Sequence, residues 1–468
     1  MAEISIVKFS ELDNKEFILS SEYYNPFVIE LDRKYKISSS VLPLMDICIK
    51  NGVRDFGSFS LYNKITYMDK SSKTGIPFLR VNDISESYVN LKNTLKIDNS
   101  SHEILKKSQV NKNDLLFSII GTLGICSMMT DSHLCNSNQN LAKITIDKNK
   151  ANPYYVAIYL NSEIGKRLSL RGESGGVQKH ITLGRTKNIP IYLLNKVKQD
   201  KIGNLYSESL RLMKEAIIKY EDAEKELLNE IGLSGLNIKE EKTFSGTFND
   251  INTFQRIDAD FFQPKYDYII NRIKSYKNGC STIINKFEIN KEPFEKNEKF
   301  IYNYVEIGSL NIFNLKITPV INNFFELPDN CKVKLNKGDL LISKVRPYRG
   351  AISIIEEDIE NLVGSTAFTI LKENSNYKKE ILLLLLKTKH YQELLMKYNV
   401  GTSYPVVKDE DVLNLPIPLI KDKIQEKLSN KIKNFFSLRN ESEKKLTQAK
   451  ELLFNEINKE LNLQIFLN

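Results

Sequence analysis

The sequence repeats itself at an offset of about 226 residues, and this duplication restricts the folds open to the chain. The motifs that recur at this offset are NDLLFS and GDLLIS at residues 113–118 and 338–343, and NIPI and NLPI at 188–191 and 414–417. SEYYNP and ADFFQP, at 21–26 and 259–264, recur at an offset of 238. Single cores usually stop growing near ~250–300 residues, and this chain has 468. The sequence therefore predicts one structural unit that is used twice.

Both copies show the same order of local patterns. Short β-branched and aromatic runs broken by Gly, Asn and Pro come first and indicate strands and turns. A long helical pattern follows at residues 201–231 and again at 424–461, with apolar residues three and four positions apart on one face. Gly232 and Gly235 are expected to end the first helix. At 1.5 Å per residue the first helix extends about 46 Å, which favours packing against its counterpart.

We therefore expect a mixed α/β fold with an internal pseudo-twofold repeat. Two α/β domains would be separated and followed by long helices that form an antiparallel coiled coil. The expected boundaries are residues 1–196 and 246–420 for the domains, and 197–245 and 421–468 for the helices with their linker. Two similar modules held about 45 Å apart suit a rod-like, nearly twofold partner, and duplex DNA has these properties, with ~34 Å per turn.

Composition excludes several classes of protein. The formal charge of +9 permits binding to nucleic acid without requiring it. The five cysteines form no CxxC pair and the four histidines have no metal-ligand spacing, so neither a zinc site nor a disulfide framework is expected. The sequence has no apolar run of the ~18–20 residues that a membrane helix needs, and its N-terminus does not resemble a signal peptide, so we expect a cytoplasmic protein without a membrane partner.

Positive charge is concentrated in two segments, residues 165–187 and 331–350, each with an excess of five. Basic and amide side chains on loops contact phosphates and base edges, although a solvated surface is the alternative for each segment. The residues expected to contact DNA are Arg80, Asn82, Asp83, Gln139, Asn140, Arg171, Gln178, Lys179, His180, Lys344, Arg346, Tyr348, Arg349, Ser365, Thr366, Thr402, Ser403 and Tyr404. The first copy has no basic residue in its equivalent of the turn at 343–350, so the two copies should read different sequences. The aromatic pairs at 23–24 and 261–262 are interpreted as core anchors.

From about residue 16 to residue 462, the duplicated order of these motifs resembles the specificity subunit of type I restriction-modification systems. The resemblance implies two target-recognition domains, each reading one half of a bipartite site in double-stranded DNA. It also implies that the helices set the spacer and dock methyltransferase subunits, expected to be two, with restriction and translocase subunits joining through the complex. S-adenosylmethionine, ATP and Mg would then belong to the partner subunits, and this chain would bind no cofactor.

Motifs for catalysis are missing from the sequence. There is no G-x-x-x-x-G-K-[ST] phosphate loop. Residues 152–155 (NPYY) resemble a methyltransferase motif only superficially and are expected to be a turn that opens a helix. We therefore expect a non-catalytic specificity subunit. The alternatives are a coiled-coil adaptor for proteins, the specificity subunit of another multisubunit DNA methylation or defence system, and a lone methyltransferase or nuclease.

Overall fold

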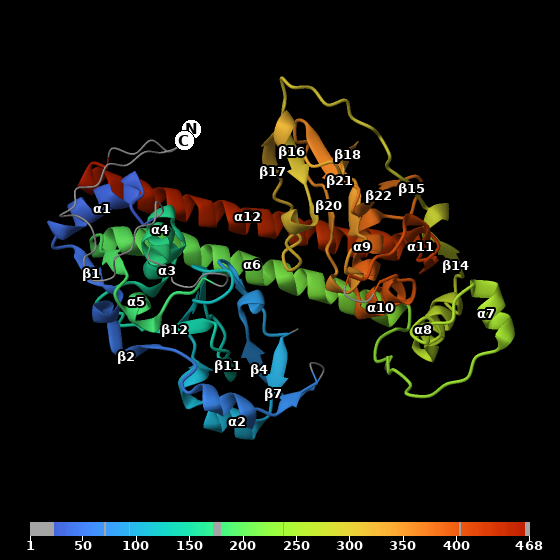
Figure 1. Ribbon diagram of the computed structural model, residues 1–468, viewed down its shortest axis with the longest axis horizontal. Helices are drawn as coiled ribbons and strands as arrows, with labels where there is room; N and C mark the ends of the chain where they lie inside the picture. The colour runs from blue at the N-terminus through green and yellow to red at the C-terminus, as the bar shows by residue number, and fades with distance from the viewer. Residues whose placement is uncertain are drawn as a thin grey trace. The chain divides into compact units, whose positions relative to one another are not determined.

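The computed structural model describes residues 23–69, 72–92, 94–171, 179–236, 238–401 and 404–463. The chain divides into two compact units (Figure 1). The first unit is Met1–Lys214 with Leu438–Asn468, and the second is Glu215–Ser437. Each of the two long helices, α6 (Lys196–Glu230) and α12 (Asp422–Leu461), therefore contributes one segment to each unit.

The first unit contains two main sheets. In order, the first sheet is β10 (Cys126–Met128), β9 (Leu115–Ser118), β12 (Leu141–Ile146) and β2 (Cys48–Arg54). The second sheet is β3 (Tyr67–Met68), β7 (Leu95–Ile97), β4 (Ile76–Leu79), β11 (Cys135–Ser137) and β8 (Gln109–Val110). The remaining strand pairs are β1 (Val41–Pro43) with β13 (Pro190–Tyr192), and β5 (Ile84–Ser85) with β6 (Tyr88–Val89). Only the neighbours β4 and β11 run parallel among the described strands of this unit.

Short helices complete the first unit. They are α1 (Pro26–Lys36), α2 (Asn99–Ile104), α3 (Pro153–Asn161), α4 (Glu163–Leu170) and α5 (Leu183–Lys187). The side chain of Asn152 accepts hydrogen bonds from the backbone N–H groups of Tyr154 and Tyr155, so it caps α3, whose first residue is Pro153. The expected turn that opens a helix at residues 152–155 is confirmed.

The second unit repeats this topology, except that no described strand corresponds to β3 and an isolated bridge between Leu310 and Ile317 replaces the β5–β6 pair. Its first sheet is β15 (Phe287–Ile289), β22 (Phe368–Glu373), β19 (Leu340–Ser343) and β20 (Ile352–Ile354). Its second sheet is β17 (Val320–Asn323), β16 (Ile301–Val305), β21 (Leu362–Ser365) and β18 (Cys331–Lys334), drawn in yellow to orange in Figure 1. β14 (Cys280–Thr282) pairs with β23 (Pro416–Pro418). Its helices are α7 (Phe248–Phe254), α8 (Pro264–Lys274), α9 (Lys379–Lys387), α10 (Lys389–Lys397) and α11 (Asp409–Leu413).

The recurring NDLL and GDLL motifs form the same turn in both units. Asp114 accepts a hydrogen bond from the backbone N–H of Asn111 at 2.8 Å, and Asp339 accepts one from the N–H of Asn336 at 2.9 Å. The residue before each aspartate has positive φ, 70° in the first unit and 94° in the second, which Asn and Gly tolerate. The parallel pairs β4–β11 and β16–β21 likewise correspond, so the expected duplication in a mixed α/β fold is confirmed.

The aromatic pairs near the start of each copy are built into their units. Tyr24 and Phe261 are buried. The guanidinium of Arg171 lies over the ring of Tyr23, and Phe261 packs edge-on against Phe262. These contacts agree with the interpretation as core anchors.

In the first unit, the segments of α6 and α12 pack antiparallel. Lys198 of α6 forms an ion pair with Glu460 of α12 at 2.8 Å, and the hydroxyl of Ser442 donates to the backbone oxygen of Ser209 at 2.7 Å. Moving forward along α6 thus means moving backward along α12. Both serines are fully buried, so this hydrogen bond fixes the register of the two segments.

In the second unit, the other segments of the same helices also pack antiparallel. The ring centroids of Tyr220 and Phe435 lie 5.4 Å apart, and Glu226 pairs with Lys431 at 2.9 Å. Gly232, with φ of 70°, follows the end of α6 as expected. In the described part of the chain, no helix is both long and apolar enough to span a membrane.

Lys143 is an exception to the shared core. It lies in β12 with no exposed surface, where the strand register of the second copy places the buried Ile370. Its amine makes one hydrogen bond among the described residues, to the backbone oxygen of Leu141 at 3.4 Å. Burial lowers its pKa from 10.5 to about 7, and the charge of Arg54 acts in the same direction.

We predict that Lys143→Met stabilises the first unit. The folded state disfavours the charged amine of Lys143, which lowers the free energy of unfolding of the wild type. This loss of stability is complete below pH ~7, where the amine is charged in both states, and vanishes above pH ~10.5, where it is neutral in both. The free energy of unfolding should rise by roughly 2–5 kcal/mol at pH 6.5, with a gain that shrinks toward pH 10. Denaturant titrations of the full chain measure this, with the exposed Lys148→Met as the control. A gain independent of pH, or equal in the control, would contradict the prediction.

Candidate nucleic-acid interface

Three segments of the second unit come together where β19 and β21 end. Ser343, the last residue of β19, lies opposite Phe368, the first residue of β22. A short turn connects the end of β21 to Phe368. The backbone N–H of Lys344 donates to the oxygen of Ala367 at 2.9 Å, and the N–H of Val407 donates to the oxygen of Lys344 at 3.0 Å. We call residues 343–350, 365–367 and 404–408 the second-unit edge.

A groove of about 500 Å³ lies along the second-unit edge. Its polar lining residues are Asn330, Lys344, Thr366, Lys408 and Asp409. Sequence reasoning missed Asn330, Lys408 and Asp409, because each joins the edge from a segment remote from the basic turn. The backbone oxygen of Asn330 accepts the N–H of Thr366 at 2.8 Å, which holds the turn after β21.

The basic turn of this edge projects two side chains into solvent. A 3-10 turn, Pro347–Arg349, lies between Arg346 and Gly350, both with positive φ. The amine of Lys387 in α9 donates to the oxygen of Gly350 at 2.9 Å and holds the end of the turn. Tyr348 is 48% exposed, and Arg349 is exposed with no ion pair to any described residue.

The other expected residues of this edge differ in accessibility. Lys344 is largely buried and pairs with Asp409 at 3.0 Å. Ser365 is buried and accepts the backbone N–H of Ala367 at 3.1 Å, whereas Thr366 is exposed. Tyr404 is 64% exposed. The remaining expected residues of this edge, Thr402 and Ser403, lie outside the described residues.

The first unit forms the equivalent edge from equivalent segments. The backbone N–H of Ile119, just after β9, donates to the oxygen of Asn140 at 2.9 Å. Ile120 forms a bridge with His180, as Val345 does with Val406 in the second unit. We call residues 80–83, 138–140 and 179–181 with the end of β9 the first-unit edge. Figure 1 shows β4 and β11 side by side, and both end at this edge.

Asp83 has a structural position within the first-unit edge. It is buried, and its carboxylate accepts the hydroxyl of Thr94 at 2.8 Å and the backbone N–H of Arg80 at 2.9 Å. The side chain of Arg80 also pairs with Asp83, at 3.3 Å, and Asn82 between them is exposed. The carboxylate therefore shapes the turn that presents Asn82.

The amide residues after β11 acquire a partner that sequence reasoning missed. The hydroxyl of Tyr62 donates to the side-chain oxygen of Gln139. Burial raises the pKa of Tyr62, so the hydroxyl stays protonated as a donor. Lys179 is exposed and His180 is half-buried, while Gln178 lies outside the described residues.

The guanidinium of Arg171 is engaged by residues near the start of the described chain. Its guanidinium pairs with Asp32 of α1, donates to the backbone oxygen of Tyr23 at 3.2 Å and lies 4.3 Å from the centre of the Tyr23 ring. These contacts fasten the start of the first unit to the end of α4.

Much of the positive charge counted along the sequence is paired in the fold. In the segment 331–350, Lys334 pairs with Glu292 at 3.2 Å and Lys337 with Asp358 at 3.8 Å, in addition to Lys344 with Asp409. In the segment 165–187, the ion pairs are Lys166 with Glu86, Arg167 with Glu163, and Arg171 with Asp32. The charge excess of these segments therefore overstates what each edge offers to phosphate.

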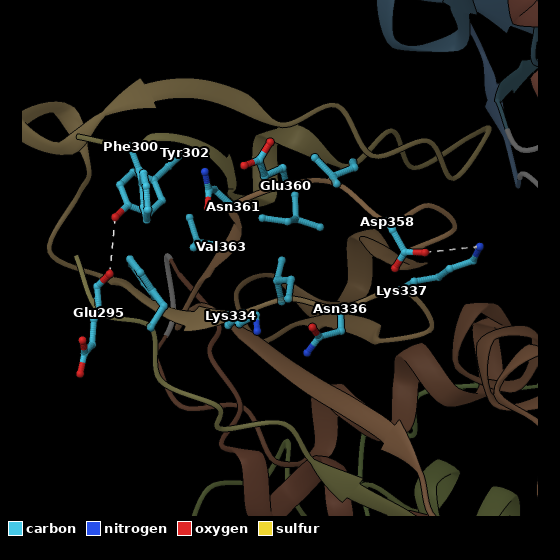
Figure 2. Close-up of a pocket in the computed structure, with 14 residues that line it drawn as sticks. Glu295, Phe300, Tyr302, Lys334, Asn336, Lys337, Asp358, Glu360, Asn361 and Val363 are labelled. Atoms are coloured by element: carbon cyan, nitrogen blue, oxygen red, sulfur yellow. Dashed lines mark hydrogen bonds and ion pairs between the residues drawn. The ribbon is translucent and has the colours of Figure 1, made fainter. Parts of the chain in front are cut away.

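A second hollow of the second unit lies at the opposite ends of its strands. A cleft of about 330 Å³ lies beside the beginnings of β16 and β21. Figure 2 shows Phe300, Tyr302 and Asn361 around it. The dashed Lys337–Asp358 pair lies at its rim. Its lining residues differ from those expected to contact DNA.

The described residues contain no group of three or more His, Cys, Asp or Glu side chains placed to hold a metal ion. The thiols of Cys331 and Cys48 are poor nucleophiles, because burial raises the pKa of Cys331 to about 11 and that of Cys48 to about 12.

Comparison with known proteins finds a family similarity in the first half of the chain. Residues 40–218 match the family model of the type I restriction modification DNA specificity domain. The chain is 29% identical over 162 residues to the type I restriction enzyme HindI specificity subunit of Haemophilus influenzae, across 33% of each protein. It is 27% identical over 130 residues to the EcoBI specificity subunit of Escherichia coli, across 28% of this chain and 27% of that protein. The alignments thus span about a third of these relatives.

A solved S subunit of a type I restriction-modification system from M. genitalium is 15% identical to the chain, with a TM-score of 0.38 over 93% of this chain and 99% of that one. The sequence matches confirm the resemblance that the duplicated motifs indicated: residues 40–218 are similar to the type I restriction modification DNA specificity domain.

Proposed function

We propose that the chain is the DNA-sequence recognition subunit of a type I restriction-modification complex and has no catalytic role of its own. One observation carries the proposal: two units of the same topology form the same edge, and the two edges carry different polar residues. Residues 1–196 and 246–420 would be the target-recognition domains. Residues 197–245 and 421–468 would supply the long helices with their linker.

The chemistry of the two edges supports reading of different half-sites. The first-unit edge offers the amides of Asn82, Gln139 and Asn140, and amide side chains pair with the edge of adenine. The second-unit edge offers Arg346 and Arg349, and guanidinium groups pair with guanine. If each edge reads one half-site, the scaffold is repeated because both edges bind DNA. The polar residues of the two edges differ because the half-sites differ.

The partner subunits would supply the chemistry of the complex. The long helices are proposed to dock modification subunits, two per complex, and restriction or translocase subunits would join through them. S-adenosylmethionine, ATP and Mg would bind to those partners. Such a complex acts on DNA in the cytoplasm, which is where we place this chain.

A coiled-coil adaptor is the second candidate, because the paired helices alone would suit it. The exposed groups of the second-unit edge favour DNA over a protein partner, since Arg349 and Lys408 stand beside exposed Tyr348 and Tyr404. Cations with interleaved aromatic rings suit phosphates and base edges.

We predict that the full chain, with its modification subunits, binds one duplex sequence tightly, with an affinity that falls steeply as salt rises. Each phosphate contact releases counterions, so the logarithm of the affinity declines linearly with the logarithm of the salt concentration. Filter binding at 50 to 200 mM salt measures the slope. A chain that binds proteins and shows no sequence-specific DNA binding would support the adaptor.

We predict opposite effects for two arginines. Arg349→Ala should weaken recognition of one half-site by ~1–3 kcal/mol and leave unfolding unchanged, because its side chain is exposed. Arg171→Ala should leave both half-sites unchanged and lower the free energy of unfolding by roughly 1–3 kcal/mol, because it loses Asp32 and the Tyr23 ring. Binding to randomised sites and thermal unfolding separate the two. An altered recognition sequence in Arg171→Ala would refute this assignment.

We predict that the helices set the spacer between half-sites. Seven residues inserted after Lys214 in α6 and seven after Ser437 in α12 keep the apolar face aligned and add about 10.5 Å to each helix. The spacer should lengthen by about three base pairs, while both half-sites stay the same. Seven residues inserted after Gly246, in an exposed loop, are the control and should change nothing. A spacer that stays the same in the helix variant would exclude this role.

A further inference from the structure

We propose that Arg346 and Tyr404 form one reading unit, in which the tyrosine ring positions the guanidinium of Arg346 against a single guanine in the half-site of the second unit. This inference deepens the proposed function and rests on it. Arg346 contacts the base, and Tyr404 acts as a positioning residue.

The backbone of Arg346 is held by one hydrogen bond to the segment that carries Tyr404 and by one within its own turn. Its N–H donates to the oxygen of Pro405 at 2.7 Å, and its oxygen accepts the N–H of Arg349 at 2.9 Å. The bridge between Val345 and Val406 lies directly beside it. The segment that carries Tyr404 is thus tied to the segment that carries Arg346, so the two side chains are presented together.

Within the described part of the chain, the guanidinium of Arg346 is stacked on the ring of Tyr404 and has no other partner. Its central carbon lies 4.3 Å from the centre of the Tyr404 ring, and that ring is 64% exposed. The Nε atom is buried, and it has neither a hydrogen-bond partner nor an ion pair among residues 23–463 as far as the structure describes them. A buried donor without a partner costs free energy, so its persistence points to a ligand that approaches this group.

The conformation of Arg346 adds a second cost that its counterpart avoids. Arg346 has a φ of 50°, in the left-handed backbone region that residues other than Gly and Asn rarely adopt. The first unit has Gly121 at the equivalent position, also with positive φ, at 90°. The shared turn therefore requires this conformation, and glycine satisfies it without strain. The second unit places an arginine there, as expected for a residue kept for recognition.

Guanine is the base that fits this pair. The planar guanidinium presents two parallel N–H groups that match the O6 and N7 acceptors of guanine in the major groove. Stacking on the ring fixes the plane of the guanidinium before DNA arrives, which lowers the conformational entropy lost on binding. A phosphate contact would need no fixed plane. With Gly121 in place of the arginine, the first unit has no equivalent pair, so this reading belongs to one half-site alone.

The test replaces one atom of the DNA. Each guanine of the recognised sequence is exchanged in turn for 7-deazaguanine, which lacks the N7 acceptor, and binding by the full chain with its modification subunits is measured. We expect one guanine, in one half-site, whose exchange weakens binding of the wild-type protein at least about tenfold. Arg346→Gly, which reproduces the residue of the first unit, should bind both duplexes equally.

The tyrosine is tested by matched variants. Tyr404→Phe keeps the ring and should retain the discrimination against 7-deazaguanine at that position. Tyr404→Leu removes the ring and should lose most of it, but should cause no further loss when combined with Arg346→Gly. Unchanged recognition of the other half-site and unchanged thermal unfolding show that each variant is folded. Discrimination that survives in Tyr404→Leu would refute the positioning role.

Three outcomes overturn the reading by Arg346. A second half-site without guanine, or equal 7-deazaguanine effects in wild type and Arg346→Gly, would exclude guanine contact. A uniform loss of affinity for all sequences with a flatter salt dependence would identify a phosphate contact instead. If the wild-type complex shows no sequence-specific binding, the proposed function fails and this inference fails with it. If the complex binds a specific sequence but shows one of the three outcomes above, the inference alone is refuted.

Discussion

The buried antiparallel packing of α6 and α12 is the interaction on which the rest of the structure depends. The first unit closes its core only with the C-terminal segment of the chain, since Ala449, Leu453 and Ile457 of α12 join the core around β12 and α3. The second unit contains the opposite segments of the same helices, where Glu226 pairs with Lys431. Each copy of the repeat thus packs against a helix segment of the other copy, so the duplication is also an exchange of helices.

That arrangement separates the scaffold from the recognition chemistry. The positions that define the scaffold carry the repeated motifs, such as the aspartate turns at Asp114 and Asp339. The positions at the edges differ: an asparagine-rich turn follows β11, whereas Ser365 and Thr366 close β21. Side chains at strand ends can change without loss of the core, because they contribute little to its burial. One fold can therefore carry two different sets of polar residues at its edges.

The fold could be predicted largely from the sequence, because repetition and helical periodicity are local signals. The end of α6 at Gly232 and the cap of α3 by Asn152 follow from single residues. The gathering of the basic turn and the turn after β21 at one edge was not predicted, because it depends on the pairing of β19 with β22. The partners of the candidate residues could not be predicted, since they are distant in sequence.

Arg171 shows the limit of counting charges along the chain. It was expected to contact DNA because it lies in a basic segment, but Asp32 and Tyr23, about 140 residues earlier, engage it. Lys344 similarly pairs with Asp409. The buried Lys143 also looked like an ordinary strand residue, and only the three-dimensional packing lowers its pKa. Exposed charge is a property of the fold, whereas the sequence shows only total charge.

The central claim is that the two copies read two different half-sites of one DNA sequence. Selection of bound duplexes from a fully randomised library, with the full chain and its modification subunits, tests this claim most directly. We predict a bipartite motif of two unlike halves separated by a fixed spacer. A single uninterrupted motif, two identical halves, or no enriched sequence would contradict it.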